Sequence, residues 1–262
     1  VGGYVTFPVI MAAHKLKIKT FLHEQNSIPG KSNKFLIKYA DKIGLSFIDS
    51  SKYFPKDKWI LTGNPCSENA INIKVTSRTK YGLSYDKKSI LIVQGSLGSE
   101  VINNKMLSFL QSIDNEPYDV LYVTGKNYYE NYSKNKFSKN VKIVPYVENL
   151  SSLLKDIDLI ITRAGASTIA EITSLGLPAI LIPSPYVANN HQYYNALSLK
   201  NANASELIEQ KDLNEKTLKE TINKILNNKN TYETYHNNLL KLSIPNSSTI
   251  IYESIKKLIN EK

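Results

Sequence analysis

Residues 159–171 read LIITRAGASTIAE, an apolar run followed at once by small residues and then by a helical pattern. The four residues Leu159–Thr162 carry no charge, as expected of a strand whose two faces are both covered. Ser167 and Thr168 lie where hydroxyl side chains commonly open a helix. A buried strand, a glycine turn and a helix in this order are typical of a parallel sheet with crossover helices.

The same alternation of short strands and amphipathic helices extends in both directions along the chain. Short runs with few charges predict strands at 19–23, 42–46, 59–62, 89–94, 120–124, 142–144, 159–162 and 179–182. Apolar residues at helical spacing predict helices at 7–15, 31–39, 100–111, 168–174, 192–199, 215–226, 232–242 and 247–260. The sequence therefore predicts an α/β protein with parallel sheets.

Two breaks divide this pattern into two lobes. Gly63-Asn64-Pro65 ends one strand, and the polar residues 66–87 that follow predict an interlobe linker. Pro245 interrupts the last helical region, and a final helix that crosses back to the first lobe would explain this break. We expect one lobe from residues 1–64 and 246–262 and a second lobe from residues 65–245.

The composition excludes several classes of protein. The 262 residues are 42% hydrophobic without a low-complexity tract, which is the profile of a packed globular protein. No apolar run approaches the roughly 18–20 residues that a membrane helix needs. A single cysteine, Cys66, excludes an intrachain disulfide and a cysteine metal cluster, and fits a reducing cytoplasm. Residues 1–64 carry ten lysines against four acidic residues, which suits an anionic partner, either a membrane surface or a nucleic acid, or plain solvation.

Ligands of such sheets bind beyond the carboxyl ends of the strands, so the loops there hold the candidate site residues. The first loop, residues 94–99, reads QGSLGS. Its small residues would let backbone N–H groups approach a phosphate, with the Ser96 hydroxyl as a further donor. The alternative is a tight connection between a strand and a helix.

The second loop begins at Arg163 and runs into the helix that contains Glu171. A carboxylate at this position can accept hydrogen bonds from both hydroxyls of a ribose diol. The alternative is a capping box, in which Glu171 returns to the backbone N–H three residues before it. Arg163 follows an apolar strand and therefore needs an anionic partner.

Two further loops are rich in polar side chains. Residues 189–192 read NNHQ, with Asn195 one turn later, and they offer neutral donors and acceptors that suit sugar hydroxyls. Residues 23–26 read HEQN and would line an interlobe cleft from the opposite side. The alternatives are a helix cap for the first loop and an ordinary polar surface loop for the second.

Other kinds of chemistry find little support. Asp156-Ile157-Asp158 has the spacing of a metal-nucleotide site, but Asp158 begins a strand and so lies away from its carboxyl end. Zinc spacing, a Gly-x-Ser-x-Gly elbow, a Walker loop and a complete Gly-x-Gly-x-x-Gly are all absent from the sequence.

Taken in order, these loops resemble the family 28 glycosyltransferases that add N-acetylglucosamine to a lipid-linked muropeptide, and the resemblance covers essentially the whole chain. The matching strings are 1–5 (VGGYV) with Pro8, 23–26 (HEQN), 63–65 (GNP), 95–98 (GSLG), 163–168 (RAGAST) with Glu171, and 190–192 (NHQ) with 195–196 (NA).

The resemblance implies the two-lobed glycosyltransferase B fold, with the first lobe incomplete. The C-terminal lobe would hold UDP-N-acetylglucosamine. The N-terminal lobe would hold the lipid-linked muramoyl-pentapeptide and touch the anionic surface of the bacterial membrane, as a peripheral protein on its cytoplasmic face. The implied reaction inverts the donor's anomeric carbon, with no metal ion, no cofactor and no nucleic acid.

The resemblance also assigns roles to single residues. It places Ser96 at the pyrophosphate, Glu171 at the ribose diol and the backbone near Val147 at the uracil. Arg163 would support a nucleotide cradle made by Ala166, Ser167, Thr168, Ile169 and Ala170. The sugar would contact Asn26, His191 and Gln192, and the acceptor side would include Gly3, Tyr4, His23 and Glu24.

The chain departs from the family pattern in three places. The family opens with a Gly-rich loop carrying a His usually assigned as general base, so we expect a truncated start and a base outside this sequence. Ser67 stands where the family usually carries Arg, and Gln94 and Ser99 replace Gly and Ala. Alternatives are another UDP-sugar transferase or epimerase of this architecture, which the 2–4 (GGY) and HEQN strings disfavour, and a fragment that binds UDP-sugars without turnover.

Overall fold

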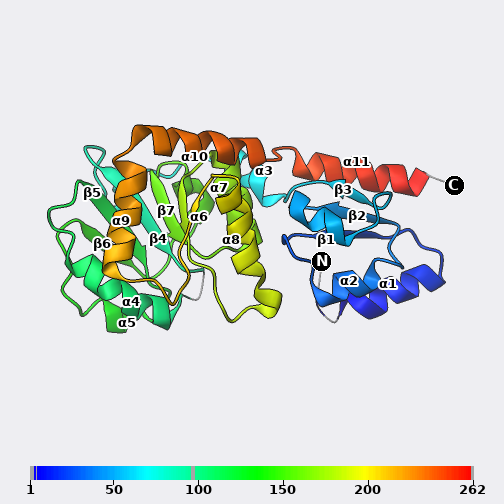
Figure 1. Ribbon diagram of the computed structural model, residues 1–262, viewed down its shortest axis with the longest axis horizontal. Coiled ribbons are helices and arrows are strands. Elements are labelled where there is room, and N and C mark those ends of the chain that lie inside the picture. The colour runs from blue at the N-terminus through cyan, green and yellow to red at the C-terminus, as the bar shows by residue number, and fades with distance from the viewer. Residues whose placement is uncertain (1–2, 4, 96–97, 261–262) are drawn as a thin grey trace.

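The computed structural model describes Gly3, residues 5–95 and residues 98–260, which contain two parallel sheets side by side (Figure 1). The small sheet has the order β1-β2-β3, with β1 (Phe21–Glu24), β2 (Lys42–Leu45) and β3 (Trp59–Leu61). The large sheet has the order β6-β5-β4-β7-β8-β9. Its strands are β4 (Lys88–Val93), β5 (Tyr118–Val123), β6 (Val141–Val144), β7 (Leu159–Thr162), β8 (Ala179–Leu181) and β9 (Glu206–Leu207). The predicted α/β fold with parallel sheets is confirmed.

Alternate residues of the central strands face opposite layers of the core. Ile90 and Ile92 of β4 pack with α4 (Glu100–Gln111) and α9 (Glu215–Leu226) in one apolar cluster. Leu91 and Val93 join a second cluster with α6 (Leu150–Leu154), α7 (Ala166–Leu175) and α8 (His191–Asn201). Successive side chains of a strand point to opposite faces, so helices on both faces explain the uncharged strand sequences.

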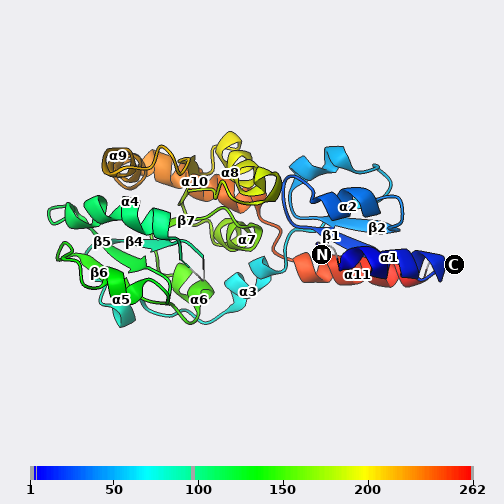
Figure 2. The same cartoon turned by 90° about the horizontal axis from the view of Figure 1, so that it is seen from below.

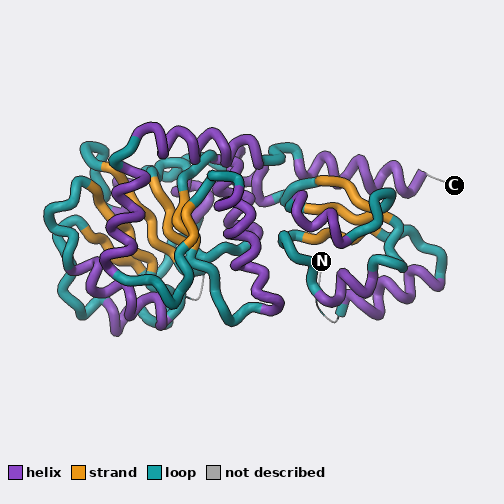
Figure 3. The backbone as a smooth tube through the Cα atoms, viewed as in Figure 1, coloured by secondary structure: helices purple, strands orange, loops and turns teal. Residues whose placement is uncertain are grey.

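The remaining helices divide between the two sheets (Figures 2 and 3). Beside the small sheet lie α1 (Thr6–Lys15), α2 (Lys31–Leu36) and α11 (Ser247–Asn260); on the other side of the junction lie α3 (Cys66–Asn72), α5 (Tyr129–Tyr132) and α10 (Lys229–Leu242). Three short segments form 3-10 helices, namely η1 (Ile48–Tyr53), η2 (Arg78–Tyr81) and η3 (Ala188–Asn190). The helix α11, which follows the break at Pro245, therefore runs alongside the sheet at the opposite end of the sequence.

The polar residues after Pro65 are more ordered than the predicted linker. They include α3, which packs against α7 with Ala70 fully buried. They also include Arg78, which is 8% exposed and bonds the Asp158 carboxylate at 2.8 Å. The sequence pattern misses this region because its four buried residues, Ser67, Ala70, Arg78 and Leu83, are scattered and include only one large apolar side chain. The same arginine accounts for Asp158, which therefore serves as an ion-pair partner in this fold.

The chain crosses between the lobes twice, first at residues 62–65, between β3 and α3, and again at residues 243–246, between α10 and α11. The two crossings touch at Gly63. Its φ of +70° lies in the left-handed region, and a Cβ there would come within 2.4 Å of Ser247 Oγ and 2.6 Å of Ile244 Cβ. Glycine is required here both for the backbone conformation and for the close approach of the second crossing.

Gly63→Ala is expected to lower the free energy of unfolding by about 1–2 kcal/mol, because the alanine meets both an unfavourable φ and a collision. Urea unfolding followed by circular dichroism measures the change. Gly30→Ala is the control, since Gly30 has a φ of −61° and open space around its missing side chain. Equal losses for the two variants would contradict this explanation.

Candidate functional site

The strand order reverses direction beside β4, which marks the expected ligand site. Along the chain β4 is followed by β5 and β6 on one side, and then β7, β8 and β9 continue on the other side. Ligands of such sheets bind beyond the carboxyl ends of the strands where the order switches. At this switch point lie the loop after β4, of which Ser96 falls outside the described residues, and the loop that begins with Arg163.

The first turn of α7 offers backbone donors at this point. The helix begins at Ala166, and Ile169 N–H makes the bond to Gly165 O at 2.9 Å. The N–H groups of Ala166, Ser167 and Thr168 precede that bond and have no partner within the helix. They lie at the positive end of the helix dipole, which favours an anion such as phosphate.

The predicted nucleotide cradle therefore divides into two parts. Ser167 is exposed and Thr168 half-buried, so both are accessible to a ligand. In contrast, Ile169 is 3% exposed and packs in the core. Because its backbone N–H is also used by the helix, Ile169 supports the shape of the site and offers no donor of its own.

Arg163 is a half-buried cation, and its hydrogen-bond partners among the described residues are all neutral. It donates to Ile182 O at 3.1 Å, to Ser99 Oγ at 3.1 Å and to Gln210 Oε1 at 2.7 Å. Burial lowers the pKa of Arg163 to about 10, so the guanidinium stays charged at neutral pH. A buried charge without an anionic partner is unfavourable, and an anion at the switch point would compensate it.

Glu171 makes a different contact from the capping box that the sequence left open as an alternative. Its Oε1 accepts a hydrogen bond from Ser151 Oγ at 2.5 Å. The helix begins two residues earlier than predicted, so Glu171 lies in its second turn, beyond reach of the capping position. Burial raises the pKa of Glu171, and the bond from Ser151 partly opposes this effect.

A second, polar cavity of about 550 Å³ lies between the lobes. Its walls include five predicted site residues, namely Gly3, His23, Glu24, Asn26 and His191. Loops from the small sheet and from the start of α8 thus meet around one space, as the sequence predicts for the two polar loops. Tyr4, the other predicted acceptor-side residue, lies outside the described residues.

Glu24 organises the loop that carries Asn26. The carboxylate is 2% exposed and accepts from Asn26 N at 2.9 Å, Gly30 N at 3.1 Å and Asn33 Nδ2 at 2.7 Å. Its oxygens are therefore engaged by the loop itself, which makes Glu24 a support for the cavity wall.

Glu24→Gln is expected to lower the free energy of unfolding by about 1–2 kcal/mol, because the new amide NH₂ faces an N–H donor and leaves it unpaired. Chemical unfolding measures this loss. Asn33→Ala is the comparison, since it removes one donor and leaves both backbone bonds of the carboxylate. A smaller loss for Glu24→Gln than for Asn33→Ala would contradict this role.

His23, His191 and Gln192, three further polar residues of these loops, also have hydrogen-bond partners in the protein. His23 Nε2 donates to Gly63 O at 2.9 Å, and burial lowers the pKa of His23, so the ring is neutral at pH 7. His191 Nδ1 donates to Ala188 O at 2.9 Å, and Gln192 Oε1 accepts from Ser184 N at 2.9 Å. Val147, predicted near the uracil, is 4% exposed, so its side chain belongs to the core.

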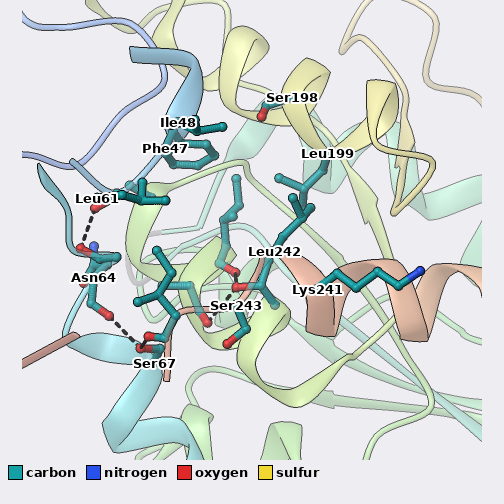
Figure 4. A pocket seen from close by; sticks show the side chains of 17 residues that line it. Phe47, Ile48, Leu61, Asn64, Ser67, Ser198, Leu199, Lys241, Leu242 and Ser243 are labelled. Atoms are coloured by element: carbon teal, nitrogen blue, oxygen red, sulfur yellow. Dashed lines mark hydrogen bonds between the residues drawn. The ribbon is translucent and has the colours of Figure 1, made fainter. Parts of the chain in front are cut away.

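A third space, at the junction itself, is apolar (Figure 4). This cavity of about 290 Å³ has walls from Phe47 and Leu61 of the small lobe, from α7 and α8, and from residues 241–244, where α10 leads into the second crossing. Ser67 lies at its edge and donates to Asn64 O at 2.8 Å. The predicted cradle residues Ala166, Ile169 and Ala170 line this cavity and not the polar one.

Within the described ranges, no group of His, Cys, Asp and Glu side chains is arranged to hold a metal ion. Among the same residues, no helix has the length and apolar character needed to cross a bilayer.

Comparison with known proteins identifies the family. Residues 89–248 match the glycosyltransferase family 28 C-terminal domain, and residues 1–45 match the glycosyltransferase family 28 N-terminal domain. The chain belongs to glycosyltransferase family 28. A family 28 relative from Bacillus cytotoxicus is 41% identical over 265 residues, which cover 99% of this chain and 73% of the relative. That relative is named UDP-N-acetylglucosamine–N-acetylmuramyl-(pentapeptide) pyrophosphoryl-undecaprenol N-acetylglucosamine transferase.

One solved structure agrees with the family 28 assignment, and a second shares the fold. The Acinetobacter baumannii MurG structure has a TM-score of 0.80 at 26% identity and covers 98% of this chain and 73% of that one. A Neisseria meningitidis UDP-GlcNAc 2-epimerase bound to UDP-GlcNAc has a TM-score of 0.72 at 19% identity, covering 96% and 73%. At that identity the second likeness shows the shared fold alone.

Two residues that hold site residues in place could not be recognised from the sequence. Ser151 holds Glu171, and Ser27 bonds Asn195 from the other lobe at 2.8 Å. Neither contact leaves a local sequence signal, because the partners are 20 and 168 residues apart.

Proposed function

We propose that the chain transfers N-acetylglucosamine from UDP-N-acetylglucosamine to the C4 hydroxyl of a lipid-linked N-acetylmuramoyl-pentapeptide, a step of peptidoglycan synthesis. The observation that carries the proposal is the 41% identity to a relative of this name over 99% of the chain. Two features support the use of a nucleoside diphosphate: the N–H groups at the start of α7 that have no partner within the helix, and Arg163, which has no carboxylate partner among the described residues.

The proposed reaction breaks the bond between the donor's anomeric carbon and the pyrophosphate oxygen. The acceptor C4 oxygen attacks from the opposite face, a base takes its proton, and UDP leaves with the electron pair. Arg163 and the first turn of α7 supply positive charge where the leaving pyrophosphate gains negative charge. We assign the base to no residue of this chain.

We propose the following substrate contacts, which the resemblance to the family assigns residue by residue. Glu171 accepts the ribose hydroxyls, the backbone near Val147 meets the uracil, and Ser96 meets the pyrophosphate. Asn26, His191 and Gln192 reach the sugar. The acceptor approaches past Gly3, Tyr4 and His23, and Glu24 supports this wall through its loop.

We further propose that the small lobe faces an anionic membrane on the cytoplasmic side. The first 64 residues carry an excess of lysine. The helix α1 and the turn after it expose apolar side chains close to several of these lysines: Val9 at 61%, Leu16 at 70% and Ile18 at 57% exposure. Such a mixture suits a charged interface with a lipid boundary. Co-sedimentation with anionic vesicles, but not with neutral vesicles at equal salt, is the expected result.

The function is tested by titration calorimetry with UDP-N-acetylglucosamine, UDP-glucose and UDP, followed by a transfer assay on a lipid-linked muropeptide analogue. Selective binding with turnover supports the transferase. Selective binding without turnover identifies this chain as a binding module, and interconversion of free UDP-sugars identifies an epimerase. Absence of binding to every UDP ligand contradicts the proposal.

A further inference from the structure

One buried side chain joins both lobes at the site. Asn195 in α8 is fully buried, and its Oδ1 accepts from Ser27 N at 2.8 Å and from Ser27 Oγ at 2.9 Å. Its Nδ2 donates to Asn26 Oδ1 at 3.1 Å and to Ala164 O at 3.2 Å. The side chain thus connects the loop after β1 with the loop that leads into α7.

The partners of Asn195 fix the direction of its amide. Ser27 N–H can only donate and Ala164 C=O can only accept, so the oxygen must face Ser27 and the nitrogen must face Ala164. The same nitrogen faces Asn26, which must then turn its own oxygen towards Asn195. The orientation of the Asn26 amide is therefore fixed through Asn195 by the backbone groups of Ser27 and Ala164, and the Glu24 carboxylate, which accepts from Asn26 Nδ2, favours the same orientation.

This polarity determines what Asn26 offers to a ligand. Its Nδ2 is directed away from Asn195 and donates to Glu24 Oε1, with 3.4 Å between the nitrogen and the oxygen. No further partner of this nitrogen is found in the described part of the chain, and Asn26 lines the polar cavity. The amide is accordingly held as a hydrogen-bond donor towards that space.

We propose that Asn195 is a positioning residue that makes Asn26 select a donor sugar with a carbonyl acceptor, such as a 2-acetamido group. A hydroxyl can donate or accept and so tolerates either orientation of the Asn26 amide. A carbonyl only accepts and needs the N–H. This role rests on the proposed use of UDP-N-acetylglucosamine.

The test uses Asn195→Asp, which keeps an oxygen for Ser27 and replaces the nitrogen with a second oxygen facing Asn26. Repulsion between the two oxygens would push the Asn26 amide out of the orientation that presents its N–H to the cavity. Titration calorimetry is expected to show a loss of about tenfold or more in the preference for UDP-N-acetylglucosamine over UDP-glucose, while UDP binds within about threefold of wild type. Asn195→Ser, which adds no charge, should lose the same preference, and serves if the aspartate variant does not fold.

Two controls separate positioning from general damage. Ser27→Ala keeps the bond from Asn195 to Asn26 and should keep the preference. In an Asn26→Ala background, Asn195→Asp should cause no further loss. Unchanged preference in both Asn195 variants, or an equal loss for all three UDP ligands, would overturn the proposal. A wild-type chain that binds UDP but does not prefer the acetamido sugar would contradict the proposed function first.

Discussion

Replacing Glu171 with alanine is expected to weaken UDP binding roughly 30- to 150-fold, or by about 2–3 kcal/mol. The carboxylate lies in α7 beyond the first-turn donors and is already held by Ser151. A fixed, partly buried carboxylate can accept two ribose hydroxyls, and its removal leaves both without partners. Titration calorimetry with UDP measures the loss directly.

The matched control is Ser151→Ala, which leaves the carboxylate in place but frees its orientation. We expect a loss of threefold to tenfold, which is smaller because only the positioning bond is removed. Since burial raises the pKa of Glu171, wild-type binding should weaken as the pH falls through that raised value. The alanine variant should lack this part of the pH dependence. A variant with wild-type affinity would remove Glu171 from the site.

Arg163→Met is expected to reduce the affinity for UDP by about 2–4 kcal/mol while leaving the folded chain as stable as wild type or more stable. The guanidinium is half-buried, its pKa is lowered by burial, and its bonding partners are neutral. Without a ligand the charge opposes folding, and with a pyrophosphate it becomes a charge-assisted donor. Calorimetry and thermal unfolding of the same samples measure both effects.

Arg163→Lys is the control, since it keeps a positive charge and loses the planar fork. We expect intermediate affinity for UDP. A methionine variant that loses stability but keeps its affinity would indicate a structural arginine and would contradict its placement at the pyrophosphate.

The regular part of the fold could be predicted from local sequence. The bounds of β7, α4, α9 and α11 agree with prediction. The strand β7 is an uncharged run between Asp158 and Arg163, and the three helices carry apolar residues at helical spacing. Asn214 also caps α9 by accepting from Thr217 N at 3.0 Å. The strand β9 was missed because it has two residues, too few to show the alternation of apolar and polar residues that indicates a strand. The helix α3 was missed because its buried residues are only Ser67 and Ala70, which give no apolar pattern.

The candidate site was predictable in its loops and not in its connections. A polar string after a strand is visible locally, so His23, Asn26, Arg163 and His191 could be named. Which atoms are free depends on distant partners, and Glu24 illustrates this, because its own loop occupies its oxygens. From the sequence, Asn195 could be named only as one of several amide side chains that follow the loop at residues 189–192.

The apolar cavity at the junction has a consequence for how the two lobes move. Its walls come from both lobes and from the second crossing, so rotation of one lobe against the other must enlarge or shrink the space. Close-packed interiors tolerate little change elsewhere, so the molar volume of the protein should follow this rotation. Hydrostatic pressure favours the state with the smaller void. Compression should therefore shift the lobes towards the arrangement that closes the junction, without altering a single charge.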